Sequence, residues 1–136
     1  MTRLFGDASY YLALLNANDE LHSLACEITP ALDAAIATTA WVLPEVVDAL
    51  KSPRNRPKAV AFVRDCQADP QITIVPPSQQ LFDAGIEFFA KRPDKEWSLT
   101  DCISFLVMEQ QGITDAVSSD HHFEHFEQAG FNILLI

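Results

Sequence analysis

Residues 3–15 read RLFGDASYYLALL, and this stretch joins a short apolar strand to a helix through one acidic residue. Residues 3–6 have the apolar pattern of a buried strand, and residues 9–15 carry apolar side chains at helical spacing. Asp7 follows the strand directly. A strand that leads at once into a helix begins a β–α unit, and a series of such units builds a parallel sheet covered by helices.

The same alternation of apolar strands and helices continues to the end of the chain. The pattern predicts further strands at 35–39, 72–75, 116–118 and 132–136. It predicts helices at 21–35, 41–50, 59–66, 79–90, 100–111 and 123–128, with a kink or break at Pro30. Right-handed crossovers between parallel strands place helices on both faces of the sheet. The sequence therefore predicts an α/β fold with a central parallel sheet.

Length, composition and charge narrow the class of protein. The 136 residues, 49% hydrophobic and 21% charged, suit one globular domain over 1–136 and exclude a disordered chain. No apolar run is long enough to span a bilayer, and no signal peptide is evident, so we expect a cytoplasmic protein. The net charge of −10 argues against nonspecific nucleic-acid binding. It leaves open an enzyme that approaches phosphates through metal ions held by carboxylates.

Four acidic residues occupy equivalent places in the expected fold. Asp7 and Asp120 follow strands, and Glu45 and Asp101 lie in the first turns of helices. All four places belong to the edge of a parallel sheet where ligands bind. Four carboxylates there repel one another unless cations neutralise them, and their oxygens suit Mg²⁺ or Mn²⁺. The alternative is that each acid only caps a helix or complements its dipole.

Four segments around these acids resemble the PIN-domain family, in particular its VapC-like ribonucleases. Two segments lie in the first half of the chain: FGDASYYLALLNANDELHSLA at 5–25 and ATTAWVLPEVVDAL at 37–50. The other two are WSLTDCISFLVMEQQGI at 97–113 and AVSSDHHFEHFEQAGFNILL at 116–135. The resemblance implies a single PIN-like domain with a three-layer α/β/α fold. It also implies metal-dependent cleavage of RNA, with the protein acting as the toxin of a toxin–antitoxin pair.

The resemblance also implies roles for particular residues. The family's catalytic acids correspond to Asp7, Glu45, Asp101 and Asp120. Asp7, Asp101 and Asp120 would bind Mg²⁺ or Mn²⁺, with Glu45 acting directly or through water. In this comparison Thr100 would orient a carboxylate or a water, and Thr39 would support the site less directly. The resemblance further implies a homodimer and an antitoxin protein that blocks the site.

A basic loop follows the second expected α/β unit. Residues 51–58 read KSPRNRPK and hold four of the nine basic residues: Lys51, Arg54, Arg56 and Lys58. These side chains could contact the phosphate backbone of an RNA substrate. They could equally form a solvated loop whose charge keeps it polar.

Other readings of the sequence stay open. His121, His122 and His125 follow Asp120, where they form either a zinc site or a surface cluster. A phosphatase would also place an acid after the first strand, but its second acid is missing because Ala8 and Ser9 follow Asp7. A third reading is a non-catalytic PIN-like module that binds RNA or protein.

Overall fold

Five parallel strands form one sheet in the computed structural model, which describes residues 3–119 and 132–135. The strands are β1 Arg3–Gly6, β2 Ala35–Thr39, β3 Ile72–Val75, β4 Asp115–Ser118 and β5 Asn132–Leu135. Their order across the sheet is β3-β2-β1-β4-β5, and all neighbouring pairs are parallel. The predicted parallel sheet is confirmed, and β1, the strand that precedes Asp7, lies at its centre.

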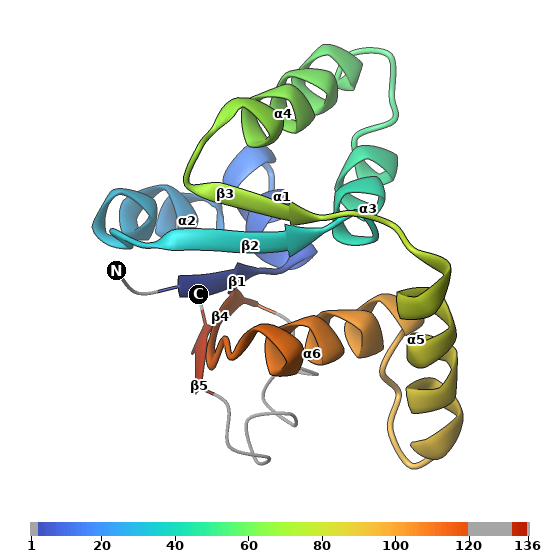
Figure 1. Cartoon of the computed structure of the whole chain (residues 1–136). Coiled ribbons are helices and arrows are strands. Elements are labelled where there is room, and N and C mark those ends of the chain that lie inside the picture. The colour runs from blue at the N-terminus through green and yellow to red at the C-terminus, as the bar shows by residue number, and fades with distance from the viewer. Residues whose placement is uncertain (1–2, 120–131, 136) are drawn as a thin grey trace.

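Helices cover both faces of this sheet. They are α1 Ala8–Leu15, α2 His22–Ile28, α3 Val42–Ala49, α4 Arg56–Ala68, α5 Gln79–Lys91 and α6 Leu99–Gln111. The sheet grows in one direction from β1 to β3 and in the other from β1 to β5, so right-handed crossovers put α1–α4 and α5–α6 on opposite faces. Figure 1 shows α1 and α2 behind the strands and α6 on the nearer side. The predicted three-layer α/β/α fold is confirmed.

The predicted kink or break at Pro30 is confirmed, but the helix predicted over 21–35 does not resume after it. α2 ends at Ile28, and Thr29–Ala31 forms a single 3₁₀ turn. Pro30 has no N–H, and its ring would clash with the carbonyl group one turn earlier, so the α-helix cannot continue. Asp33, between this turn and β2, has a φ of 32°.

The predicted loop over 51–58 is also too long. α4 begins at Arg56 rather than at residue 59, because Pro57 suits the first turn of a helix, where its missing N–H has no partner to lose. Pro44 is accommodated in the first turn of α3, as predicted. The predicted helix 123–128 and residue 136 lie outside the described residues.

The core fills the space between the sheet and its helices. Its largest fully buried side chains include Phe5 of β1, Tyr10 of α1 and Phe105 of α6. Gly6 is needed where β1 leaves the core, since a Cβ there would lie 2.8 Å from Tyr11 Cζ. Across 3–119 and 132–135, every helix is too short or too polar to cross a membrane.

Candidate active site

A pocket of about 330 Å³ lies beside the carboxyl end of β1, and we call it the acidic pocket. Three of the four predicted acids line it from three different helix starts: Asp7, Glu45 and Asp101. The other lining residues are Ala8, Ser9, Leu12, Glu96 and Ser98. Asp120, the fourth predicted acid, lies outside the described residues. Residues from distant parts of the sequence therefore converge as the parallel topology predicts.

Asp7 is buried and held by a network of hydroxyl groups. Its Oδ2 accepts hydrogen bonds from Ser9 Oγ at 2.6 Å and from Ser118 Oγ at 2.8 Å. The backbone N–H of Ser9 also points at Oδ2, at 3.4 Å, so Asp7 caps α1. Hydrogen bonds to a carboxylate are stronger than those between neutral groups. The network therefore fixes the orientation of Asp7 at the wall of the pocket.

The end of β4 is joined to the same network. The backbone N–H of Ser119 donates to Ser9 Oγ at 2.9 Å, and Asp7 N donates to Val117 O at 3.2 Å. These bonds bring residues 117–119 against the start of α1. Asp120 is the next residue in the sequence.

Asp101 combines the two roles that the sequence left open. It is the third residue of α6 and forms a capping box with Ser98: Asp101 N donates to Ser98 Oγ at 3.0 Å, and Ser98 N donates to Asp101 Oδ2 at 3.1 Å. Its side chain is almost fully buried, yet it lines the acidic pocket. The residue is therefore both a helix cap and part of the pocket wall.

Glu45 approaches the pocket from the exposed side of α3. The start of α3 is fixed by Thr39, whose buried Oγ1 accepts hydrogen bonds from the backbone N–H groups of Trp41 and Val42, each at 3.1 Å. Thr38, next to it, donates through Oγ1 to Gly6 O at 3.1 Å and ties β2 to β1. The hydroxyl group of Thr39 thus determines where α3 begins and, through the helix, where Glu45 lies.

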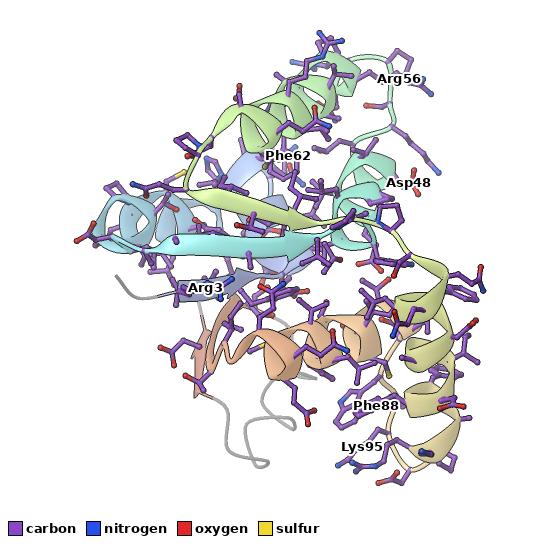
Figure 2. The ribbon with its side chains drawn as sticks, in the orientation of Figure 1. Arg3, Asp48, Arg56, Phe62, Phe88 and Lys95 are labelled. Carbon is purple, nitrogen blue, oxygen red and sulfur yellow. The ribbon has the colours of Figure 1, made fainter. Side chains whose placement is uncertain are left out.

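Thr100 and the basic residues lie away from the acidic pocket. Thr100 is half-buried in the first turn of α6, where Ser98 rather than Thr100 caps the helix, and it is not among the described residues that line the pocket. Arg54 and Lys58 line a separate pocket near the end of α1. Arg56 lies on another side of α4, as Figure 2 shows beside the α3–α4 connection. His121, His122 and His125, for which the sequence left a zinc site and a surface cluster open, lie outside the described residues.

Sequence reasoning missed four polar residues around the pocket. Glu96 adds a fourth carboxylate, and Ser9, Ser98 and Ser118 supply the hydroxyl groups that bind Asp7 and Asp101. Glu96 lies in the loop before α6, where no periodic pattern marks it. The serines were detectable only as polar residues two or three positions from a predicted acid.

The donor chemistry of the pocket suits a hard divalent cation. Its lining includes Asp7, Glu45, Glu96 and Asp101, and no Lys or Arg among the described residues lines it. Carboxylate oxygens are the ligands that Mg²⁺ and Mn²⁺ prefer. Within residues 3–119 and 132–135, however, no three Asp, Glu, His or Cys side chains lie close enough together to bind a metal ion. A complete site would therefore need Asp120 or a shift of the lining acids.

The fold and the pocket together define the family. Residues 4–129 match the family model of the PIN domain, so the chain belongs to the PIN-domain family. It is 27% identical over 128 residues to "23S rRNA-specific endonuclease VapC20" of Mycobacterium tuberculosis, covering 94% of this chain and 95% of that protein. The predicted resemblance to VapC-like PIN-domain proteins is confirmed.

Solved structures give the same result. The crystal structure of Mycobacterium tuberculosis VapC20, described as a sarcin–ricin loop cleaving toxin, superimposes with a TM-score of 0.81 at 26% identity, covering 94% of this chain and 95% of that one. FitAcB from Neisseria gonorrhoeae has a TM-score of 0.65 at 14% identity, with 96% of both chains covered. A toxin–antitoxin complex from Klebsiella pneumoniae has a TM-score of 0.61 at 14% identity, with 87% of both covered. These last two likenesses concern the fold alone.

Proposed function

We propose that this protein is an endoribonuclease that hydrolyses RNA phosphodiester bonds at the acidic pocket with the help of Mg²⁺ or Mn²⁺. The observation that carries the proposal is the convergence of Asp7, Glu45 and Asp101 on one pocket without a neutralising Lys or Arg among its described lining. A phosphate anion would be repelled there unless a cation accompanied it. VapC20 is named as an endonuclease of 23S rRNA, so ribosomal RNA is the first substrate to test.

The acids would have two roles, binding a cation and accepting a proton. Asp7, Asp101 and Asp120 would hold the ion. When bound, a divalent ion neutralises phosphate charge and makes a nearby water more acidic. Glu45, the more exposed acid, would accept a proton from the attacking water or orient that water. Ser9 and Ser118 keep Asp7 in place, and Thr39 sets the position of Glu45 through the start of α3.

The environment of Asp7 speaks against the phosphatase alternative. In that mechanism the acid after the first strand attacks phosphorus itself, so one of its oxygens must reach the substrate. Here Asp7 Oδ2 accepts hydrogen bonds from two serine hydroxyls, and Ser9 stands where a second acid would be needed. The second acid that this mechanism needs is therefore absent from position 9.

Two protein partners belong to the proposal. An antitoxin that covers the acidic pocket fits a protein whose relatives include toxins. A homodimer would cover the apolar stripe on α5, where Phe82, Ile86 and Phe89 recur at helical spacing and are 39–50% exposed. The measurement that decides the dimer is the molar mass in solution of the wild type and of Ile86→Asp.

An RNA cleavage assay tests the function directly. The purified protein is incubated with a mixed RNA pool and with a sarcin–ricin loop hairpin, in Mg²⁺, in Mn²⁺ and in excess chelator. We expect cleavage in either metal and none in chelator, with activity returning when metal is added back. Cleavage that persists in chelator would contradict the metal mechanism. RNA binding without cleavage under every condition would favour the non-catalytic module.

A further inference from the structure

A second polar pocket of about 470 Å³ lies where the end of α1 meets the start of α4. We call it the basic pocket. Its lining residues are Asn16, Ala17, Asn18, Arg54, Asn55 and Lys58. Two cationic side chains and three amides thus line it, and none of its described lining residues is an acid. In a chain with a net charge of −10, this local composition is suited to an anion.

The fold separates the four basic residues of 51–58 into two groups. Arg54 and Lys58 are four positions apart and share the basic pocket. Arg56 instead lines another surface of α4 with Arg64, and its Nε donates to Lys51 O at 2.7 Å. Figure 2 shows Arg56 at the outer end of α4. The basic loop is therefore not one continuous patch.

Contacts between α1 and α4 shape the basic pocket. Lys58 Nζ donates to Leu15 O, the last residue of α1, at 2.9 Å. An ammonium group has three donors, and this bond uses one of them. Asn16, the C-cap of α1, accepts from Asn18 N through Oδ1 at 3.0 Å, which orders the turn on the other side. The cationic wall is thus fixed against the end of α1.

The acidic and basic pockets lie along one face of α1. Ala8 and Leu12 line the acidic pocket, and Asn16, one further turn along, lines the basic pocket. Positions four apart stack on the same face of a helix. The two linings are four to eight residues apart on α1, which at ~1.5 Å per residue is about 6–12 Å along the helix axis. At a rise of ~3.4 Å per stacked nucleotide this range corresponds to about two to four nucleotides.

We propose that the basic pocket binds a backbone phosphate of the RNA strand whose cleaved bond lies in the acidic pocket, about two to four nucleotides away. This inference rests on the proposed ribonuclease function. Arg54 and Lys58 supply the charge, and the three asparagines supply amide donors to the phosphate oxygens. The strand then runs along α1, so the pocket selects the position of the cleaved bond and not the identity of the base.

A pair of double variants tests the anion site by binding. Arg54→Gln/Lys58→Gln removes both charges of the basic pocket, and Arg56→Gln/Arg64→Gln removes two charges from the other surface of α4. Both variants change the net charge equally. The probe is a fluorescent mixed-sequence RNA 12-mer pool in chelator, because phosphate contacts are independent of sequence. Affinity is measured by anisotropy over a range of salt concentrations.

The two variants should behave differently. We expect Arg54→Gln/Lys58→Gln to bind about tenfold more weakly, with a salt slope smaller by about 0.7 for each phosphate that the variant no longer neutralises. We expect Arg56→Gln/Arg64→Gln to stay within about twofold of the wild type. Equal weakening of both variants, or unchanged binding by the first, would overturn the proposal. Equal weakening would show a general charge effect. Unchanged binding by Arg54→Gln/Lys58→Gln would indicate that the basic pocket binds an acidic protein partner instead of RNA.

Cleavage of a modified RNA tests the position of the phosphate. A neutral methylphosphonate is placed two, three or four nucleotides to either side of the bond that the wild type cuts. At the matching position we expect about tenfold slower cleavage by the wild type and no further slowing of Arg54→Gln/Lys58→Gln. Equal slowing of both proteins would overturn the inference about the phosphate site without contradicting the proposed ribonuclease function. If the wild type cuts no RNA, the proposed ribonuclease function itself is contradicted, whatever the anisotropy measurements show.

Discussion

Ser118 Oγ donates a 2.8 Å hydrogen bond to Asp7 Oδ2, which joins the ends of the adjacent strands β4 and β1. The two residues are 111 positions apart in the sequence. The bond fixes the first acid of the pocket to the strand that leads towards Asp120. Stability and site geometry are therefore coupled at this point.

Ser118→Ala should lower the free energy of unfolding by about 1.5–3 kcal/mol, the range for a hydrogen bond to a charged group. The serine is fully buried, so water cannot replace it. Urea unfolding at neutral pH measures the change. Ser119→Ala is the control, because Ser119 reaches Ser9 through its backbone N–H and should stay within about 0.5 kcal/mol of the wild type. Equal stability of Ser118→Ala and wild type would refute the coupling.

Thr39→Val should destabilise the protein by about 1 kcal/mol and slow RNA cleavage, because valine keeps the shape of threonine but removes the oxygen that caps α3. Glu45 lies on that helix, so its position becomes less defined, and kcat should fall more than KM changes. Thr39→Ser keeps the oxygen and should restore kcat, although the loss of a buried methyl group should leave its stability below that of the wild type. A valine variant with normal kcat would show that Thr39 has no positioning role.

Gly6→Ala should cost about 1–3 kcal/mol, because the added methyl group collides with the buried ring of Tyr11. Tyr11→Phe removes the atom that the methyl group meets first, so the double variant should recover part of the loss. Gly112→Ala is a contrasting case. It has open space around it but a φ of 66°, so it should cost about 1–2 kcal/mol through backbone strain alone, and Tyr11→Phe should not relieve it. Urea titrations of the three single variants and of the two double variants compare these losses.

Iodoacetamide at pH 8 should label one thiol per folded chain, that of exposed Cys26. Burial, with a smaller contribution from Asp65, raises the pKa of Cys66 to about 11. Burial, with a smaller contribution from Asp101, raises the pKa of Cys102 to about 11. Mass spectrometry counts the labels. Rapid modification of all three thiols at pH 8 would contradict the burial of the other two.

The two buried thiols, those of Cys66 and Cys102, make the free energy of unfolding depend on alkaline pH. Their pKa values are about 9 for an exposed thiol and about 11 in the folded protein, so the unfolded chain releases protons first. Their contribution to stability is complete below pH 9 and is lost as the pH rises towards 11. Cys66→Ala/Cys102→Ala should weaken this alkaline loss.

The sequence predicted the strands well because short apolar runs between polar turns leave few alternatives in a parallel sheet. It predicted the break at Pro30 but not that the helix ends there, and it missed that Pro57 lies in the first turn of α4. The family acids were recognisable from their positions next to strands and helix starts. Glu96 was not, since its place in the pocket depends on the conformation of the loop before α6. The separation of Arg54 and Lys58 from Arg56 could likewise not be predicted, because it depends on where α4 begins.

Asp101→Asn tests the central claim most directly, through cleavage of a mixed RNA pool in Mg²⁺. Asparagine caps a helix about as well as aspartate, so the fold and the bond from Ser98 N should persist. A neutral amide binds a hard dication more weakly than a carboxylate does. Glu109→Gln, the same change at the far end of α6, is the control. We predict that Asp101→Asn melts at or above the wild-type temperature without metal but cleaves at least ~100-fold more slowly, while Glu109→Gln cleaves normally. Cleavage by Asp101→Asn at the wild-type rate would contradict the catalytic role of the acidic pocket.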